Sequence, residues 1–571
     1  MKKSKAVLKA LIGTSSIGLI TTPIMTLASC GNNQNDPVQA KAEELSYKTL
    51  VHFFNDICRY PHPTYWFGPL NKHITNFVEQ KFGITVYRDD YLKSTAQAQW
   101  DDQYKNYYGN IWFDIPATKG YENYPKVVLQ GHMDMVIDGM SVEEAKTTPI
   151  EPELDIDIET GSTIIHSKDH LTSLGADDGI GLSIILAVIC DQTINHGPIR
   201  VLITADEEDG LIGAGNLGIK EGSQDRYDVL GDCKYLLNID EEALGRLVKS
   251  SGGIRYIWYQ FNDSDTDGNA KPVPIDSTLS NQFTISAKGF KGGHSGGEII
   301  GHANAIKAIL DVLQEFNSKE DKKFQLISAS TSANVVNTIP RDANFTFATN
   351  VSKEEINTQI QTVIDSYKTK YQAEDYNNVK VECSNAKEIA TNALGLDISK
   401  KLISMMSSFW YGVKDYLIPN EVPSTSANVG PINLALDTVS NLYTFKFGTA
   451  SRSCYRNVLE DFESQNTKLS DDYFGPDHYD IFGKAPPFEP EEKNILRTIL
   501  ANGMTKYGVT PEITDTHGGL EISYFKEINP NIIQTSFGPT INNCHTINET
   551  MFVDTITPTI EALLYTLPLL K

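Results

Sequence analysis

The first half of the chain alternates short apolar runs with glycine-rich or acidic turns. Residues 127–129, 199–204 and 235–239 are mainly apolar and end in polar or charged residues, a pattern that predicts buried strands. Between the first two runs lies a nearly continuous apolar segment, 182–190, that predicts a buried helix. Because strands alternate with helices, this part of the chain predicts an α/β sheet.

The pattern changes after Gly252-Gly253. Residues 254–260 and 282–287 alternate between apolar and polar side chains, as strands with one exposed face do. Further strands are predicted at 324–329, 343–350, 379–383 and 442–447, with helices at about 305–317 and 353–371. This mixture predicts a second, α+β domain over residues 254–478, inserted into the first.

The segments on either side, 45–253 and 479–571, are therefore assigned to one domain. Its early part predicts helices over 45–80 with a break at 60–63, then strands at 82–89 and 111–115 around a loop insertion at 90–110. Its late part predicts a helix up to about 507 with Pro490 in its first turn, a strand at 532–537, and a last helix at 557–567.

The N-terminus reads as a targeting segment. Three lysines precede a largely apolar stretch, 6–26, which Leu27-Ala28-Ser29-Cys30 closes. This resembles a bacterial lipoprotein signal, which implies that residues 1–29 are removed and that Cys30 is lipidated. Residues 30–44 would be a polar tether, and the protein would be anchored to the outer face of the membrane without spanning it. An ordinary secretory peptide and an uncleaved anchor are the alternatives.

Potential metal ligands follow each of the three apolar strands. His132 and Asp134 follow the first, Glu207 and Glu208 the second, and Asp240 the third. Sites in α/β folds form at the carboxyl ends of the strands, so these side chains are expected at one edge of the sheet. Singly, each has a structural explanation: a buried histidine paired with an aspartate, or a solvated acidic loop.

A glycine-flanked aspartate, Asp177, precedes the apolar helix in Gly175-Ala176-Asp177-Asp178-Gly179. A helix N-cap would explain one such residue, but glycines on both sides also allow a close backbone approach.

Composition excludes several functions. Among 571 residues, 49 are basic and 73 acidic, a net charge of -24, so the surface repels nucleic acid. The seven cysteines are scattered without a C-x-x-C pair, which argues against a zinc finger or a disulfide framework.

Six motifs stand in a recognisable order: Gly131-His132-Met133-Asp134, Gly175-Ala176-Asp177-Asp178, Asp206-Glu207-Glu208, Asn238-Ile239-Asp240, Gly292-Gly293-His294-Ser295-Gly296 and a late His545. This order resembles the co-catalytic zinc peptidases, which include the carboxypeptidase G type, peptidase T and the dipeptidases. The sequences of residues 116–123, 129–136 and 174–181 are most similar to the aminoacyl-histidine dipeptidase family, and the resemblance covers about 45–571.

The resemblance implies a zinc-peptidase catalytic domain, with a mixed sheet flanked by helices, and an inserted lid domain. It implies two zinc ions, or cobalt or manganese, about 3.5–4 Å apart. In this scheme one metal is bound by His132 and the other by His545, Asp177 bridges both, and Glu208 and Asp240 each complete one site. Asp134 would orient His132. Glu207 would be the general base.

In the lid, the resemblance implies that His294 contacts the substrate carbonyl, in some dimers from the partner subunit. A structural loop histidine is the alternative. Asn337 and Arg452 are candidates for binding the ends of the substrate. The chain departs from the family at His302, where relatives carry arginine, and at 517–523, so substrate preference is left open.

The sequence thus predicts a surface-anchored dipeptidase that cleaves small unblocked dipeptides, Xaa-His among them, as a monomer or homodimer. A related aminoacylase or carboxypeptidase is one alternative. A lipoprotein that binds peptides or a host surface without catalysis is the other.

Overall fold

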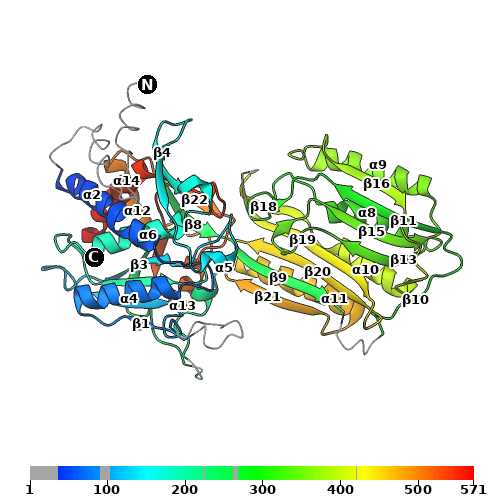
Figure 1. The fold of residues 1–571 in the computed structure, drawn as a ribbon, viewed down its shortest axis with the longest axis horizontal. Coiled ribbons are helices and arrows are strands. Elements are labelled where there is room, and N and C mark those ends of the chain that lie inside the picture. The colour runs from blue at the N-terminus through cyan, green and yellow to red at the C-terminus, as the bar shows by residue number, and fades with distance from the viewer. Residues whose placement is uncertain (1–35, 91–102, 221–222, 224, 262–267, 420) are drawn as a thin grey trace. The chain divides into compact units, whose positions relative to one another are not determined.

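The computed structural model describes residues 36–90, 103–220, 223, 225–261, 268–419 and 421–571 (Figure 1). They form two compact units. Unit 1 comprises the described residues up to Val248 together with Glu492–Thr514 and Tyr524–Lys571. Unit 2 comprises Lys249–Glu491 and Asp515–Ser523. The sequence places the inserted domain at 254–478, and unit 2 extends past both of these ends.

Unit 1 is built on a mixed six-stranded sheet in the order β1-β2-β6-β3-β7-β23. Four neighbouring strands are parallel, while β2 pairs antiparallel with β6 and with the edge strand β1. Their bounds are Tyr87–Arg88 (β1), Ile111–Ile115 (β2), Lys126–His132 (β3), Ile199–Thr204 (β6), Cys233–Asn238 (β7) and Ile533–Ser536 (β23). The predicted α/β sheet is confirmed, with the three predicted central strands side by side.

The apolar segment after Asp178 forms the buried helix that the sequence predicts. Every residue of α6 (Ala176–Ile189) is buried, and the helix packs against β3. The other α-helices of this unit are α2 (Pro37–Lys48), α3 (Asn55–Ile57), α4 (Gly68–Phe82), α5 (Val142–Ala145), α7 (Ile212–Gly215), α12 (Ile495–Lys506) and α14 (Ile556–Thr566). Shorter turns are η2 (Thr49–Phe54), η4 (Lys168–His170), η5 (Val553–Thr555) and η6 (Leu567–Leu569).

A small antiparallel sheet in unit 1 positions the last histidine of the chain. Its order is β24-β25-β5-β4, with bounds Ile541–Asn542 (β24), Thr550–Phe552 (β25), Thr163–Ser167 (β5) and Pro152–Ile156 (β4). His545 lies in the loop between β24 and β25, where its φ of 65° is left-handed.

Unit 2 is organised around a nine-stranded antiparallel sheet in the order β16-β11-β15-β13-β19-β20-β9-β21, with β18 also paired to β19. The bounds are Gly253–Gln260 (β9), Asn281–Lys288 (β11), Phe324–Ser330 (β13), Ala343–Thr349 (β15), Lys380–Asn385 (β16), Gly412–Ile418 (β18), Val422–Asp437 (β19), Leu442–Ser453 (β20) and Tyr479–Ala485 (β21). Burial alternates along β9 and β11, as the sequence pattern predicts.

The helices of unit 2 are α8 (Ala305–Asn317), α9 (Lys353–Lys370), α10 (Leu396–Ser408) and α11 (Arg456–Phe474). Short strand pairs join β10 (Val273–Pro274) to β17 (Asn392–Ala393) and β12 (Gly293–His294) to β14 (Thr338–Ile339). The remaining elements are β8 (Arg246–Ser251), β22 (Glu512–Thr516) and α13 (Ile522–Ile528), each of which contains residues of both units.

Three local predictions differ from the structure. Helix α2 begins at Pro37, inside the predicted tether, because Asp36 caps it and the helix buries apolar side chains such as Ala42. The predicted strand 82–89 shrinks to β1, since α4 runs to Phe82 and ends at left-handed Gly83. Helix α12 is capped by Asn494, so Pro490 precedes it instead of lying in its first turn.

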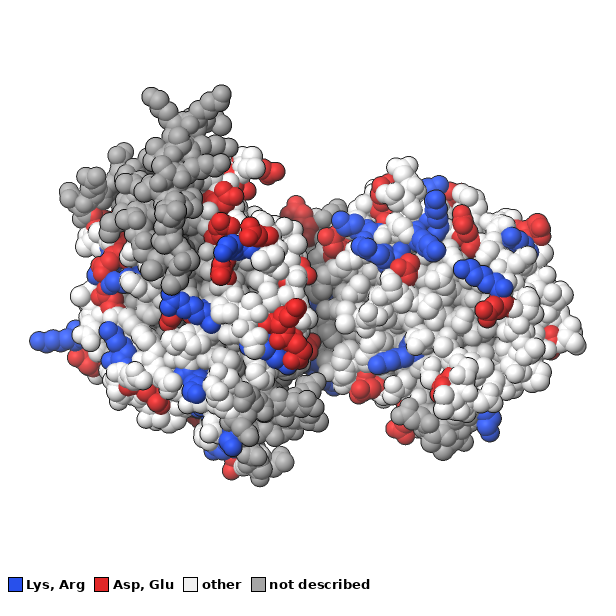
Figure 2. All heavy atoms as spheres, in the orientation of Figure 1, with Lys and Arg blue, Asp and Glu red and all other residues white. Residues whose placement is uncertain are grey.

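Some predictions fall outside the described residues. These include the targeting segment, Cys30 and most of the insertion at 90–110. Among the described helices, none has the length and apolar character needed to cross a bilayer. On the face that Figure 2 shows, acidic and basic side chains are interspersed.

Candidate metal centre

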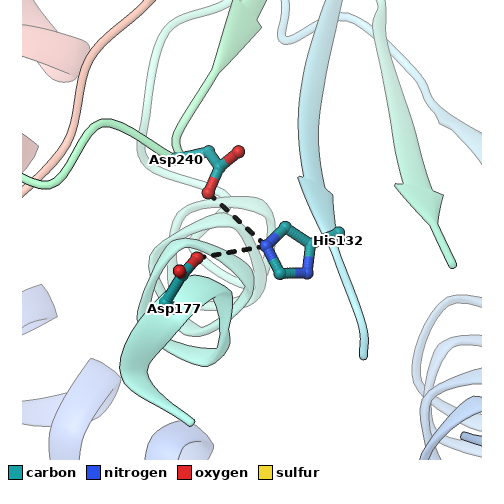
Figure 3. A group of neighbouring side chains, drawn as sticks. All are labelled: His132, Asp177 and Asp240. Carbon is teal, nitrogen blue, oxygen red and sulfur yellow. Dashed lines mark hydrogen bonds and ion pairs between the residues drawn. The ribbon is translucent and has the colours of Figure 1, made fainter. Parts of the chain in front are cut away.

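The ends of the three central strands bring the predicted ligands of unit 1 together. His132 is the last residue of β3, Asp240 follows the end of β7, and Glu207 and Glu208 follow the end of β6. These strands are parallel neighbours, so their carboxyl ends share one edge of the sheet. Asp177 reaches the same place from the first turn of α6 (Figure 3).

One histidine and two aspartates form a first cluster. His132 Nε2 lies 3.1 Å from Asp177 Oδ1 and 3.5 Å from Asp240 Oδ1 (Figure 3). All three side chains are at most 10% exposed. One imidazole nitrogen facing two carboxylate oxygens is a ligand arrangement that suits a divalent cation of the zinc type.

A second cluster shares Asp177 with the first. His545 Nε2 lies 3.1 Å from Asp177 Oδ2 and 2.8 Å from Glu208 Oε2. Asp177 therefore turns one oxygen to each histidine, as a carboxylate that bridges two cations must. The His545 side chain is 46% exposed, whereas that of His132 is 1% exposed, so the second position is the more open.

The donor set fits cations better than it fits a self-contained polar cluster. Within the described chain, Glu208 Oε1 is buried and has no hydrogen-bond partner. Buried polar atoms without partners are rare in folded proteins, and a missing ion is one of the explanations. The residues present are therefore suited to hold two divalent cations.

The raised pKa values of the buried carboxylates also indicate that these residues suit cations. Burial raises the pKa of Glu208 to about 7, and the negative charge of Asp177 adds to this. Burial likewise raises the pKa of Asp240. For His545, burial alone would lower the pKa, but hydrogen bonds to Asp177 and Glu208 raise it to about 11. Protons on these groups take the place that cations would occupy, so cation binding must displace them.

The His132 ring is fixed by its other nitrogen. Its Nδ1 lies 2.9 Å from the backbone carbonyl oxygen of Asp134, which can accept that N–H and leave Nε2 as the ligand atom. The Asp134 carboxylate lies farther away, 3.7 Å from Nδ1.

The Asp134 carboxylate holds the acidic loop instead. Its Oδ1 accepts the backbone N–H of Glu207 at 3.0 Å, and its Oδ2 accepts that of Glu208 at 3.4 Å. Thr64 donates its hydroxyl to the same carboxylate. Asp134 therefore connects β3 to both glutamates. Glu207 Oε2 lies 4.0 Å from His132 Nε2, at the edge of the centre.

Comparison with known proteins identifies the family to which this centre belongs. A model of Peptidase family M20/M25/M40 matches residues 128–568, which is more than half of the chain. The chain belongs to this peptidase family. It is therefore a peptide-bond hydrolase of a metal-dependent class, and the predicted family and enzyme class are confirmed.

Two similar proteins cover most of the chain. The cytosol non-specific dipeptidase of Escherichia coli (strain K12) is 27% identical over 527 residues, which are 90% of this chain and 96% of the relative. The crystal structure of aminoacylhistidine dipeptidase from Vibrio alginolyticus has a TM-score of 0.69 at 26% identity, covering 96% of this chain and 99% of the other.

A more distant solved structure is similar in fold. Aminopeptidase PepT from Bacillus cereus ATCC 10987 has a TM-score of 0.50 at 16% identity, covering 92% of this chain and 98% of the other.

Three further residues near the centre of this M20 peptidase have no local sequence pattern that predicts a role. Glu242 and Cys544 offer ligand atoms that lie within 4.8 Å of one another and of a ligand atom of Asp177. Glu549 accepts hydrogen bonds from the backbone that leads into Asp177. Periodicity cannot identify them, because each lies in a loop far along the chain from its partner.

The substrate-binding candidates lie in unit 2, where the structure brings them together. His294, on β12, pairs in register with Thr338 on β14, and the Asn337 carbonyl accepts the Ser295 N–H at 2.7 Å. Arg452, on β20, places Nη2 3.3 Å from His294 Nε2.

The environment of Arg452 is suited to an anion. The residue is 3% exposed, and its Nη2 donates to the Tyr256 hydroxyl at 2.9 Å. Among the described residues, none accepts a hydrogen bond from its Nε. A buried guanidinium with donor groups to spare is a natural partner for a carboxylate.

His302, where the sequence departs from the family, lies between two carboxylates. Its ring nitrogens each lie 3.7 Å from a carboxylate oxygen, one of Glu298 and one of Glu374. Glu374 in turn accepts the backbone N–H of Lys291 and of Ala303. His302 therefore helps to hold the glycine-rich loop that carries His294, through Glu374.

Proposed function

We propose that this M20 peptidase hydrolyses small unblocked dipeptides, Xaa-His dipeptides among them, with two zinc ions. The observation that carries the proposal is the pair of histidine–carboxylate clusters that share Asp177, with Glu207 beside them. The names of two relatives, a non-specific dipeptidase and an aminoacylhistidine dipeptidase, support the substrate class.

His132, Asp177 and Asp240 would hold one cation, and His545, Asp177 and Glu208 the other. Bound there, two cations lower the pKa of water and polarise a carbonyl group. Glu207 belongs to neither of these two clusters, and its Oε2 lies 4.0 Å from His132 Nε2. It would accept the proton of the attacking water and return it to the amine that leaves when the peptide bond breaks. Asp134 holds the backbone of Glu207 in place for this transfer.

A free carboxyl terminus on the substrate fits the groups of unit 2. Arg452 would bind that carboxylate in a two-pronged contact, and His294 would donate to the carbonyl oxygen of the bond that is cut. Asn337, beside the His294 loop, would contact the substrate backbone. A dipeptide amide, which lacks the carboxylate, is then expected to be a much poorer substrate than the free dipeptide.

The test is a dipeptide panel that includes β-alanyl-histidine, assayed with zinc and with the Glu207→Gln variant. General-base catalysis typically contributes 10²–10⁴-fold, so the variant should lose about that much in kcat while it still binds the cations. Wild-type protein that cleaves no dipeptide would refute the proposed activity. A fully active variant would refute only the role of Glu207.

The same substrate panel distinguishes a dipeptidase from an aminoacylase or carboxypeptidase and from a non-catalytic lipoprotein. Cleavage of N-acylated amino acids in preference to free dipeptides would identify an aminoacylase or carboxypeptidase. A peptide-binding lipoprotein without catalysis is not favoured, because the family membership and the complete set of potential ligands both indicate an enzyme. Cobalt and manganese belong in the same assay, since carboxylate and imidazole ligands accept them too.

We also propose that acyl chains on Cys30 anchor the protein to the outer face of the cell membrane. The support is the Leu27-Ala28-Ser29-Cys30 pattern after a basic and apolar stretch. The full chain should enter the detergent phase of a cloud-point partition, and a Cys30→Ser variant should stay in the aqueous phase. Wild type that stays in the aqueous phase would contradict the anchor. A homodimer remains a prediction, which sedimentation of the detergent-solubilised protein would check.

A further inference from the structure

A carboxylate from the end of the chain holds the loop that carries Asp177. Glu549 is 2% exposed and lies four residues after His545. Its two oxygens accept four consecutive backbone N–H groups, at 2.7 and 2.9 Å for Oε2 and at 2.8 and 3.2 Å for Oε1. In chain order, the donors are Leu174, Gly175, Ala176 and Asp177.

Two of these N–H groups lie just before α6 and two at its start, and all four need an acceptor outside the helix. The first N–H groups of an α-helix have no acceptor within it. The N-cap of α6 is Gly175, at a φ of 70°, which has no side chain to cap with. Glu549 supplies the missing acceptor, and its negative charge suits the positive end of the helix dipole.

The same residue is fixed to the loop of the second histidine. The backbone N–H of Glu549 donates to the Thr546 carbonyl at 3.0 Å, directly after His545. The next residue, Thr550, begins β25, which pairs with β5. One side chain therefore joins the loop of the shared ligand Asp177 to the loop of His545.

We infer that Glu549 is a positioning residue that joins these two loops, so that both cation positions form together. This inference rests on the proposed function, because it assigns cations to the two clusters. Without the bonds from Glu549, Asp177 could still contact each histidine, but its loop would no longer be held in one arrangement. Both positions share Asp177, so both should weaken at once.

The variant Glu549→Gln keeps the size of the side chain and changes its chemistry. The amide nitrogen donates, so two of the four backbone N–H groups lose their acceptor. Loss of a residue that orients metal ligands typically costs 10–100-fold in metal affinity. The expected result is a weakening of that size for both cations, measured by zinc titration against a chromophoric chelator.

Asp89 provides a matched control. It is a fully buried carboxylate of the same unit and accepts the backbone N–H of Asn110 and of Gly218, each at 2.9 Å. The Asp89→Asn variant should lower thermal stability but leave zinc affinity within about twofold of wild type, because Asp89 has no part in either cluster.

We call the contact between Glu549 and the backbone of residues 174–177 the clamp. Hydrogen exchange on the cation-free protein tests this clamp without relying on activity. In Glu549→Gln, the amides of residues 174–177 should exchange at least tenfold faster than in wild type, and those of β6 should not change. Unchanged exchange at 174–177, or zinc affinity equal to wild type, would overturn the inference. So would a loss of affinity no larger than in Asp89→Asn.

A second variant and the wild-type protein distinguish failure of the inference about Glu549 from failure of the proposed metal centre. If Glu549→Gln does not fold, Glu549→Asp keeps both oxygens on a shorter side chain and should bind zinc more weakly than wild type. Glu549→Asp with wild-type affinity would then count against the clamp. Wild-type protein that binds no zinc would refute the proposed metal centre, whereas the exchange result on the cation-free protein would still decide the role of Glu549.

Discussion

At the scale of single residues, burial sets how side chains titrate. His517 in unit 2 is 6% exposed, and its Nε2 lies 2.6 Å from the Ser426 hydroxyl. Burial lowers the pKa of His517 to about 3, and the positive charge of Arg452 contributes. The ring is therefore neutral in the folded protein at any pH near neutrality.

This histidine should make stability depend on pH in one direction. In the unfolded chain its pKa is about 6.5, so below that pH the unfolded state takes up a proton that the folded state cannot hold until about pH 3. Stability is then lost as pH falls through this window, by about 1.4 kcal/mol per pH unit from this group alone.

The measurement compares denaturant unfolding of wild type and His517→Gln at pH 7.5 and pH 5. The variant cannot protonate there, so its free energy of unfolding should fall by about 2 kcal/mol less than that of wild type over this range. Equal pH dependence in the two proteins would show that His517 is accessible to protons in the folded state.

At the scale of elements, the metal centre depends on close contact between strand β3 and helix α6. Asp178 lies between them and accepts the backbone N–H of His132 and of Gly181, each at 3.2 Å. A Cβ on Gly131 would lie 2.2 Å from Asp178 Oδ2, and one on Gly181 would lie 2.1 Å from Asp178 Oδ1. Both glycines are thus required by the space that this carboxylate occupies.

Alanine at Gly131 or Gly181 should therefore destabilise unit 1. Overpacking in a well-packed core typically costs 1–3 kcal/mol, and here it also displaces the Asp178 carboxylate that holds the His132 backbone. We expect a loss of about 2 kcal/mol or more in the free energy of unfolding, together with weaker zinc binding.

Gly179, in the same helix, is the matched control. A Cβ there would come no closer than 3.4 Å to Phe54 Cε2, an ordinary contact. Alanine in a helix is favoured over glycine by about 0.5–1 kcal/mol, so Gly179→Ala should be neutral or slightly stabilising. Equal stability in all three variants would show that positions 131 and 181 do not require glycine.

At the scale of the whole molecule, the predicted ligands all lie in unit 1 and the substrate-binding candidates in unit 2. A ligand that binds only the folded state stabilises it, by about 2.7 kcal/mol when its concentration is 100 times the dissociation constant. Burial raises the pKa values of Glu208 and Asp240, and the negative charge of Asp177 adds to this, so cations should also relieve that repulsion.

Removal of metal with a chelator should therefore loosen unit 1 selectively. Hydrogen exchange at β3 and β6 should speed up on addition of the chelator, while exchange at β13 and β15 stays nearly constant. Adding zinc back should restore the slow exchange. Equal acceleration in both units would mean that the stabilising cations do not bind at the clusters described here.

The sequence alone determined the central strands, the apolar helix and the presence of ligands at the strand ends. These features depend on short-range patterns, because a short apolar run predicts a buried strand. The carboxyl ends of parallel strands then lie at one edge of the sheet. The order of six motifs then indicated the family, and with it the two clusters around Asp177.

Only the tertiary structure decided how these residues are held. The backbone carbonyl of Asp134 lies closer to the His132 ring than its carboxylate does. The carboxylate instead accepts the backbone N–H groups of Glu207 and Glu208. Glu549 clamps a loop 372–375 residues earlier in the chain. Such contacts have no local signature, because hydrogen bonds between distant loops are set by where the whole chain places them and not by any repeat along it.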